Sequence, residues 1–425
     1  MLIKPKEILI PKKKDLTRWA VIACDQFTSD FDYWQKTKEY IGKSVSSLNL
    51  ILPEIYLNDK PESRIEKINE NMRRYLNNNV FKSLGECFVL TARKTAYGNL
   101  RLGIVLAVDL EEYSYEKGNR ALIRATEGTI LERLPPRIKI RENAPLELPH
   151  IMLLIDDVKN EIIKPLYEKR KSLEKVYGFK LCMGGGSVEG YKITDTKGVT
   201  ESFLRLLNKD TLIKKYGKDE KFLFAAGDGN HSLASAKAVW NNFKRGLSAK
   251  EAENHPLRYA LCEVVSLYDE GLKFEPIHRF IKGVDAERFA QGEFPSSRGA
   301  AAAAGWLYEN DALPGRGLLK GKLIYNGKKT DIGFPSDISL AVSGTDEYIK
   351  NYINGSGGEV DYIHGEKDLE KLVKGNANSV GIVMPSMEKG QLFKTVIESG
   401  ALPRKCFSMG EAEEKRYYLE ASKIM

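Results

Sequence analysis

The segment from Lys221 to Leu247 constrains the fold more than any other part of the sequence. It begins with the apolar run KFLFAA, which is typical of a buried strand, and continues into Gly227-Asp228-Gly229. Two glycines around an aspartate permit a sharp turn and a close approach of the backbone to a ligand. Beyond the turn, apolar residues recur at positions 233, 236, 240, 243 and 247, which form one face of a helix. The segment therefore predicts a strand, a tight turn and a helix in succession.

Strand-like and helical segments alternate along most of the chain, which favours a mixed α/β (α+β) fold. Further strands are expected at residues 18–23, 86–94, 101–110, 150–157 and 271–281. The sequence Tyr-Gly-Asn at residues 97–99 predicts a hairpin turn between two of them. Helices are expected at residues 32–41, over the charged stretch 158–177, and at the charged C-terminal segment 410–424.

The length of 425 residues exceeds the size at which a single core stops growing, so two or three subdomains are expected. Residues 1–115 are predicted to form an N-terminal α/β subdomain. Residues 116–292 are predicted to form the core that carries Glu127 and the motif at Asp228–His231. Residues 293–425 are predicted to form a C-terminal subdomain, with the stretch from Pro295 to Arg316 at the boundary.

Composition excludes several classes of protein. The net charge of +8 comes from 66 basic and 58 acidic residues, and no helix or arm concentrates the excess, which disfavours a nucleic-acid binder. The five cysteines are widely separated, which argues against a disulfide framework and against a structural zinc site. We find neither a signal peptide nor a run of the roughly 18 apolar residues that span a bilayer. A cytoplasmic protein without a membrane partner is expected.

The corner, which we define as residues Gly227–Ser232, is the strongest candidate site. The turn opens a helix, whose free N–H groups and positive dipole end suit a phosphate. Asp228 is a candidate to hold a magnesium ion or a ligand hydroxyl, and His231 is a candidate for donation to a phosphate or for proton transfer. The alternative is structural, since Asn230 or Ser232 could simply cap the helix.

A second constellation extends from Ile123 to Arg141. It contains Glu127 among basic residues and around the pair Pro135-Pro136; its other polar members are Arg124, Thr129, Arg133, Arg137 and Arg141. A carboxylate among several arginines can serve as a general base beside an anion-binding cluster. The alternative is a surface helix with ordinary ion pairs.

Four other motifs carry weaker signals. His278 and Arg279 end a predicted strand, where a ligand site could use them. The run Gly-Gly-Gly-Ser at 184–187 could cradle a phosphate, although a flexible turn is favoured. Residues 361–366 offer two acids and a histidine with spacing too loose for a metal site. Residues 402–408 place a cysteine beside two cations, which could activate its thiol, although a buried structural cysteine is favoured.

Four of these motifs occur in a fixed order. They are RATEGT (124–129), GDGNHSLASA (227–236), L-x-F-x-P-I-H-R (272–279) and LPRKCFS (402–408). In this order, and over nearly the whole chain, the sequence resembles the bacterial and archaeal family known as domain of unknown function 1015. The opening WAVIACDQFTSDFDYW is similar to a subgroup of that family.

The chain departs from the commoner family pattern at two places. Commoner members carry H-E-x-T at residues 126–129 and D-G-H-H-R at residues 228–232. Glu127, Asp228 and His231 are therefore retained, while a histidine and an arginine are lost. The lost arginine matters most, because arginine suits bidentate phosphate binding. Candidates to replace it are Arg124, Arg141 and Lys237.

The D-G-x-H corner also resembles that of the ParB and sulfiredoxin superfamily, which includes free-serine kinases. This resemblance implies a ParB/sulfiredoxin-like core with mixed sheets and a corner that binds nucleotide phosphates. It also implies that Glu127 is the base and that Asp228 and His231 lie at the phosphates. Sulfiredoxin has a reactive cysteine where this chain has Asn230, which argues against thiol repair.

The leading hypothesis is an enzyme that transfers or hydrolyses a phosphoryl group on a small phosphorylated metabolite, kinase-like and dependent on a nucleotide and magnesium. The alternatives are a non-catalytic ligand-binding protein and a ParB-like nucleic-acid-binding protein. A homodimer is left open. The predicted catalytic residues are Glu127, Asp228 and His231, with Asp228 also the metal ligand. The predicted substrate- or phosphate-binding residues are Arg124, Thr129, Arg141, Gly227, Gly229, Asn230, Ser232, His278 and Arg279.

Overall fold

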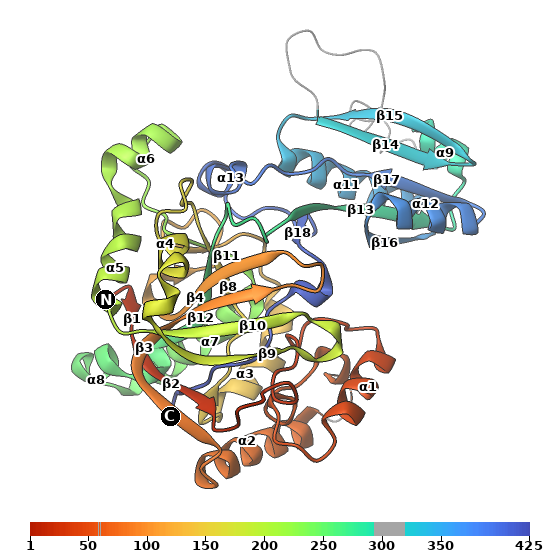
Figure 1. The fold of residues 1–425 in the computed structure, drawn as a ribbon. Helices are drawn as coiled ribbons and strands as arrows, with labels where there is room; N and C mark the ends of the chain where they lie inside the picture. Colours follow the sequence, from red (N-terminus) through yellow and green to blue (C-terminus); the bar gives the residue numbers. More distant parts are fainter. Residues whose placement is uncertain (58, 60, 293–318) are drawn as a thin grey trace. The chain divides into compact units, whose positions relative to one another are not determined.

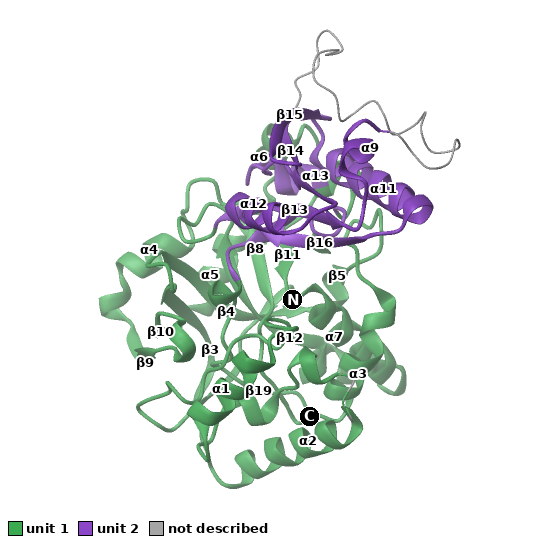
Figure 2. Ribbon diagram, turned by 90° about the vertical axis from the view of Figure 1, so that its right-hand side faces the viewer, with its two compact units in different colours: residues 1–272, 396–401, 412–425 green, residues 273–395, 402–411 purple. Residues whose placement is uncertain are grey.

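The chain folds into two compact units. The computed structural model describes residues 1–57, 59, 61–292 and 319–425 (Figure 1). Unit 1 comprises residues 1–272, 396–401 and 412–425, and unit 2 comprises residues 273–395 and 402–411 (Figure 2). The expected boundary from Pro295 to Arg316 lies outside the described residues, and the division at residues 115 and 292 stays a prediction. Within the described ranges, no helix has the length and apolar character needed to cross a membrane.

A large mixed sheet forms the centre of unit 1. Its strands are β1 (Ile3–Lys4), β2 (Lys6–Pro11), β3 (Phe81–Lys94), β4 (Leu100–Asp109), β5 (Tyr113–Ser114), β6 (Ile123–Ala125), β8 (Met152–Ile155), β9 (Glu174–Lys180), β10 (Ser187–Ile193), β11 (Phe224–Asp228) and β12 (Tyr259–Ser266). Their order is β5-β6-β11-β8-β12-β4-β3-β10-β9, with β1 beside β4 and β2 beside β3. A separate small sheet pairs β7 (Leu146–Glu147) with β19 (Ser422–Lys423).

Strand direction brings three loops to one edge of this sheet. β6 and β11 are parallel, with Ala125 opposite Ala226. β8 runs antiparallel to β11, with Met152 opposite Asp228. The carboxyl ends of β6 and β11 therefore lie at the same edge as the amino end of β8. This arrangement places the loop 126–130, the corner and residues 148–151 beside one another.

The helices of unit 1 pack against the sheet or against one another. They are α1 (Phe31–Ile41), α2 (Pro61–Asn77), α3 (Leu134–Glu142), α4 (Ile163–Glu168), α5 (Thr196–Leu204), α6 (Lys209–Tyr216), α7 (Asn230–Phe243) and α8 (Ala249–Asn254). α7 buries Leu233, Ala236 and Trp240, as its apolar spacing predicts, and α3 packs against it. These side chains belong to one continuous core with the central strands, which include Ile104 and Val105.

Unit 2 is a smaller antiparallel sheet with helices of its own. Its strands are β13 (Phe274–Lys282), β14 (Leu319–Tyr325), β15 (Lys328–Phe334), β16 (Glu359–His364), β17 (Ser379–Val383) and β18 (Phe407–Met409), in the order β15-β14-β17-β13-β16 with β18 beside β13. The helices are α9 (Ala286–Ala290), α11 (Ile338–Ser356) and α12 (Glu366–Gly375); α13 (Gln391–Ser399) is shared with unit 1. Phe280 and Leu369 lie in its apolar core.

The expected mixed α/β class is confirmed, and so are the elements with strong local patterns. The hairpin of β3 and β4 turns through residues 95–99, where Thr95 N–H donates to the Asn99 carbonyl at 2.8 Å and Gly98 has a φ of 85°. The strand β11 and the helix α7 meet at the predicted turn. The expected helix at 32–41 corresponds to α1, and the expected strands at 150–157 and 271–281 correspond to β8 and β13.

Three expected elements are wrong. Residues 19–23 are buried and Arg18 is exposed, but the segment makes only a single bridge among the described residues, from Ile22 to Tyr417. The expected helix over 158–177 ends at Glu168 with α4, and β9 begins at Glu174. The expected C-terminal helix is instead an extended chain that threads into unit 1 beside β2 (Figure 1). Every residue from 416 to 422 is buried, so this segment has no solvent face of the kind that a charged surface helix requires.

Candidate functional site

The corner is a tight turn for two physical reasons. Gly229 has a left-handed φ of 74°, which favours glycine. A Cβ at this position would also lie 3.0 Å from Cα of Ile151 and 3.5 Å from Cδ2 of His150. No side chain caps α7, which begins at Asn230. The alternative that Asn230 or Ser232 serves as a helix cap is therefore wrong.

The loop 126–130, which carries Glu127, is joined to the corner by hydrogen bonds. The Thr126 hydroxyl donates to the carbonyl of Ala226 at 2.7 Å. The backbone N–H of Ile130 donates to Nε2 of His231 at 3.2 Å. An imidazole nitrogen that accepts a hydrogen bond carries no proton, so Nδ1 is the nitrogen of His231 that can donate. The structure thus places the Glu127 loop and His231 side by side, although they are far apart in sequence.

Two polar atoms of the loop and the corner are buried without a hydrogen-bond partner among the described residues. They are Oγ1 of Thr129 and Oδ1 of Asn230. Thr129 directly precedes Ile130 and Asn230 directly precedes His231, so both residues adjoin in sequence the pair that forms the hydrogen bond between the loops. Buried polar groups are normally satisfied by protein, water or a ligand. Both residues are among those predicted to bind phosphate, and the loop and corner carry the polar groups that such a ligand needs.

The cation at the corner is Lys415, which the sequence patterns do not indicate. Its Nζ lies 3.6 Å from Oδ2 of Asp228, and its side chain is 11% exposed. The other carboxylate oxygen of Asp228 accepts a hydrogen bond from Gly229 N–H at 3.0 Å. Lys415 reaches the corner because the C-terminal segment is extended and buried, which sequence periodicity did not reveal.

Arg124 and Arg141, two candidates to replace the lost arginine, are held by other partners. Arg124 is buried and donates to Glu220 at 2.7 Å and to the carbonyl of Ala121 at 2.8 Å. Arg141 donates to Glu147 at 2.7 Å. These bonds fix the end of β6 and the end of α3. Each guanidinium is already paired with a carboxylate.

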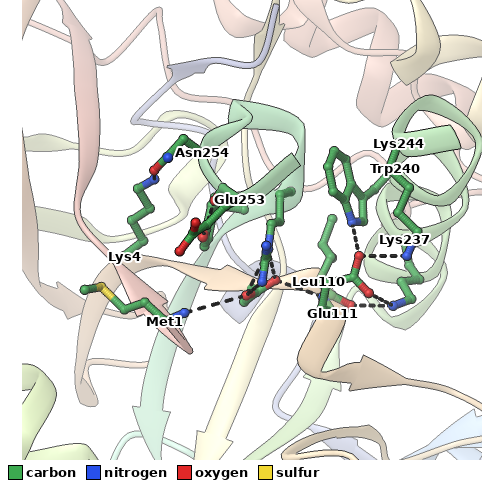
Figure 3. A network of polar contacts seen from close by, with 12 residues as sticks. Met1, Lys4, Leu110, Glu111, Lys237, Trp240, Lys244, Glu253 and Asn254 are labelled. Atoms are coloured by element: carbon green, nitrogen blue, oxygen red, sulfur yellow. Dashed lines mark hydrogen bonds and ion pairs between the residues drawn. The ribbon is translucent and has the colours of Figure 1, made fainter. Parts of the chain in front are cut away.

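Lys237, the third candidate, anchors α7 to the turn after β4 (Figure 3). Its Nζ donates to the carbonyl of Leu110 at 2.7 Å and lies 3.6 Å from a carboxylate oxygen of Glu111. Glu111 also accepts from Nε1 of Trp240 at 2.6 Å and from Nζ of Lys244 at 2.7 Å. Burial raises the pKa of Glu111, but its hydrogen bonds with Lys244 and Trp240 outweigh this and lower it. Lys237 therefore has a structural role. It lies farther along α7 than the first turn, which borders the corner.

His278 and Arg279 belong to unit 2 and are engaged within it. The guanidinium of Arg279 is fully buried, pairs with Asp346 at 2.9 and 3.1 Å and donates to the carbonyl of Lys405 at 3.0 Å. Nδ1 of His278 accepts from the backbone N–H of Met384 at 3.1 Å. Burial lowers the pKa of His278 to about 4, so its imidazole is neutral at pH 7. Both side chains stabilise unit 2.

A histidine that the sequence patterns do not indicate lies against the corner. Nε2 of His150 is 3.0 Å from Oγ of Ser232, and Nδ1 is 2.9 Å from the hydroxyl of Tyr418. A carboxylate oxygen of Asp25 lies 3.8 Å from Nε2. We call Ser232, His150 and Tyr418 the His150 trio. Only the direction of β8, which starts just after His150, would have indicated its place at this edge.

The residues available for a magnesium ion are few. Over the part of the chain that the structure describes, no group of three or more His, Cys, Asp or Glu side chains has the arrangement of a metal site. Magnesium bound with phosphates commonly takes only one or two protein carboxylates. Asp228 is the carboxylate at the corner that fits this role, and its assignment as a metal ligand stays a prediction.

Comparisons with known proteins give a family and distant likenesses in structure. None of the curated proteins compared matches the sequence. A conserved hypothetical protein from Pyrococcus furiosus is 13% identical with a TM-score of 0.34, over 74% of this chain and 90% of that one. A free serine kinase in complex with AMP is 11% identical with a TM-score of 0.37, over 75% and 92%. SbnI with a C-terminal truncation, from Staphylococcus aureus, is 9% identical with a TM-score of 0.36, over 72% and 82%.

These likenesses in structure are too distant to support an argument about function, but the family match is extensive. Residues 3–303 match the family described as "Protein of unknown function (DUF1015)". The match contains both the Glu127 loop and the corner, whereas Lys415 and Tyr418 lie beyond it. The chain therefore belongs to the DUF1015 family.

Proposed function

We propose that unit 1 binds a nucleotide or another phosphorylated small molecule at the junction of the corner and the Glu127 loop, and that it transfers or hydrolyses a phosphoryl group there. The observation that carries this proposal is the pair of buried, unpartnered atoms, Oγ1 of Thr129 and Oδ1 of Asn230. Asn230 is the first residue of α7, a helix of 14 residues whose N-terminus has no side-chain cap among the described residues, and Thr129 lies in the loop that bonds to His231. Helix N-termini attract phosphate through their N–H groups and dipole.

The surrounding charges fit the same ligand. Lys415 supplies the positive charge that the lost arginine would have given, and Nδ1 of His231 can donate to a phosphate oxygen. Asp228 would hold magnesium, which neutralises charge on the phosphates when it is bound. Glu127 would be the general base that accepts the proton of the attacking hydroxyl or water, as the resemblance to free-serine kinases implies.

One observation favours a non-catalytic ligand-binding protein as the second candidate. Nε2 of His231 accepts a hydrogen bond from the N–H of Ile130, and Asp228 is paired with Lys415. These two predicted catalytic groups thus have partners within the protein. Such a protein would bind the phosphorylated ligand without turning it over, so binding and turnover are measured separately.

Calorimetric titration with ATP, ADP and AMP, with and without magnesium, tests the site. Thr129→Val removes an unpartnered hydroxyl at constant shape, so nucleotide affinity should fall about tenfold while the free energy of unfolding does not fall. Thr126→Val is the matched control, because its hydroxyl bonds to Ala226 and its loss should cost about 1 kcal/mol of stability. Asp228→Ala should abolish the magnesium-dependent part of binding.

The outcomes separate the candidates. Nucleotide binding with slow hydrolysis or transfer supports the enzyme, and binding without turnover of any added metabolite supports the binding protein. If the intact protein binds no nucleotide and no phosphometabolite, the proposed site is wrong. If Thr129→Val lowers stability as much as Thr126→Val does, the Thr129 hydroxyl is structural and the main observation loses its force.

A further inference from the structure

A pocket in unit 1 borders the corner and shares Ser232 with it, but the function proposed above uses none of its other lining residues. Its cavity volume is about 130 Å³, close to the roughly 150 Å³ of an apolar cavity that binds benzene. Its body is lined by aliphatic side chains from the segment before α2, from α2 and α3, and from the strands near β8; examples are Leu50, Leu52, Met72, Ile140, Leu148 and Leu261. A largely apolar ligand would bury its surface against these walls.

The charged groups of the pocket are neutralised by one another. Arg137 forms an ion pair with Glu54. Arg141 pairs with Glu147 at 2.7 Å, and Glu147 also accepts from Nζ of Lys6 at 2.7 Å. Burial alone would raise the pKa of Glu147, but Lys6 and Arg141 together hold it below its ordinary value. The two arginines and two glutamates of the lining balance in charge, although Glu147 is shared with Lys6, which lies outside the lining. Nε of Arg141 is buried without a hydrogen-bond partner among the described residues. A lining without net charge favours a neutral ligand.

The polar end of the pocket is the His150 trio together with Cys24. Burial raises the pKa of the Cys24 thiol to about 12, so this end carries no thiolate. If Nδ1 of His150 donates to Tyr418, then Nε2 accepts from Ser232, whose oxygen is left to accept from a ligand. In the other tautomer Nε2 donates to Ser232, whose proton is left to donate. A hydroxyl satisfies either arrangement, because it both donates and accepts.

This polar end adjoins the corner. Ser232 lies in the first turn of α7, and a Cβ on Gly229 would come within 3.5 Å of Cδ2 of His150. The head group of a ligand in the pocket would thus lie beside the phosphate site, while its body extends away from it toward α2 and α3.

We propose that this pocket binds a neutral, largely aliphatic alcohol whose hydroxyl bonds to Ser232 and His150. Three observations carry the proposal: the aliphatic walls, the paired charges of the lining, and the His150 trio at one end. The pocket requires no phosphate ligand at the corner, so it can be tested independently of the proposed function.

Displacement of the neutral fluorescent probe N-phenyl-1-naphthylamine tests the pocket. If Ser232 accepts from the ligand, 1-octanol should displace the probe at about tenfold lower concentration than 1-methoxyheptane, an ether of equal length that accepts but cannot donate, and Ser232→Ala should remove this advantage. If Ser232 donates to the ligand, the two should displace the probe equally, and Ser232→Ala should weaken both about tenfold. Ile140→Trp, which fills the pocket from α3, should weaken both ligands and the probe.

Ile138→Trp is the matched control for Ile140→Trp, because Ile138 is half-buried on the same helix but does not line the pocket. Displacement by alcohol and ether that Ser232→Ala leaves unchanged would overturn the assignment of the head group. Equal effects of the two tryptophan variants, or no displacement by either ligand, would overturn the site. Nucleotide titration of Ile140→Trp is run alongside: retained nucleotide binding together with lost alcohol binding shows that the two sites are separate.

Discussion

The two units differ in how they use buried charge. In unit 2, Arg279 makes one ion pair, with Asp346, whose side chain is 32% exposed. In unit 1, Arg416 is 3.0 Å from the carboxylate of Glu263 and 2.7 Å from that of Glu420, and both carboxylates are almost completely buried. The pair in unit 2 joins a strand to a helix, whereas the network in unit 1 fastens the C-terminal segment to the centre of the sheet.

This difference shows what the unit 1 network accomplishes. Lys415 and Tyr418, which lie on either side of Arg416 in the sequence, reach the corner and His150. The buried ion pairs therefore hold in place the segment that supplies part of the candidate site. Unit 2 has no such coupling among its described residues, since His278 and Arg279 contact only groups that stabilise its own sheet and helices.

The largest expected effect comes from breaking the two charge networks separately. Arg416→Met leaves Glu263 and Glu420 buried without their shared cation, which should destabilise unit 1 by about 3–5 kcal/mol. Arg279→Met should destabilise unit 2 by less, about 2–3 kcal/mol, because water can reach Asp346. Hydrogen-exchange mass spectrometry in increasing urea measures each unit from its own peptides.

An exposed arginine provides the control for these variants. Arg245 follows α7 on the surface and has no ion pair among the described contacts, so Arg245→Met should change neither unit by more than about 0.5 kcal/mol. The proposed difference between the units is wrong if Arg416→Met increases hydrogen exchange in unit 2 peptides at lower urea than in unit 1 peptides. It is also wrong if the two buried-arginine variants affect both units equally. Either result would mean that the units are not separately stabilised.

Local patterns predicted the parts of the fold that local contacts determine. The hairpin of β3 and β4 and the turn from β11 into α7 have their signals within a few residues of the structure that they form. The C-terminal segment does not, because its charges suggest a solvated helix until Arg416 meets Glu263 from another strand. A buried ion pair between distant segments leaves no periodic signal in the sequence.

The residues of the candidate site also fall into two groups, those that local motifs predicted and those that they did not. The Glu127 loop and the corner could be found from their motifs, since each is a compact group of chemically distinctive residues. His150 and Lys415 could not, because their positions depend on the direction of β8 and on the path of the C-terminal segment. The functional interpretation of His278 and Arg279 came from a motif whose side chains turn out to be engaged in packing unit 2.

The next largest predicted effect is a difference between the two units in how their stability depends on pH. Because burial lowers the pKa of His278 to about 4, against 6.5 when unfolded, the unfolded chain binds a proton between these pH values that the folded chain does not. Stability from this group is therefore complete above pH 6.5 and declines as pH falls to about 4, by up to about 3 kcal/mol. Glu147 and Glu263 in unit 1 have pKa values below the ordinary 4.5, so their contribution declines only below that pH.

Hydrogen exchange from pH 7 to 4.5, corrected for intrinsic rates, should thus show unit 2 losing protection before unit 1. His278→Asn keeps an acceptor for the N–H of Met384 but cannot titrate in this range, so it should flatten the pH dependence of unit 2. Parallel loss of protection in the two units, or an unchanged slope in His278→Asn, would assign the effect to other groups.

The smallest effect tests whether the C-terminal segment belongs to the ligand site. Lys415→Met removes the cation 3.6 Å from Asp228 and leaves that carboxylate to repel a phosphate. Nucleotide affinity should fall about tenfold, equivalent to about 1.4 kcal/mol, and added magnesium should restore part of it by supplying positive charge.

Lys237→Met is the matched control, because Lys237 lies on α7 but is held at Leu110 and Glu111. Equal losses in both variants would indicate a general effect of positive charge. No loss in Lys415→Met would restrict the phosphate site to the Glu127 loop and the corner, and the C-terminal segment would then be purely structural.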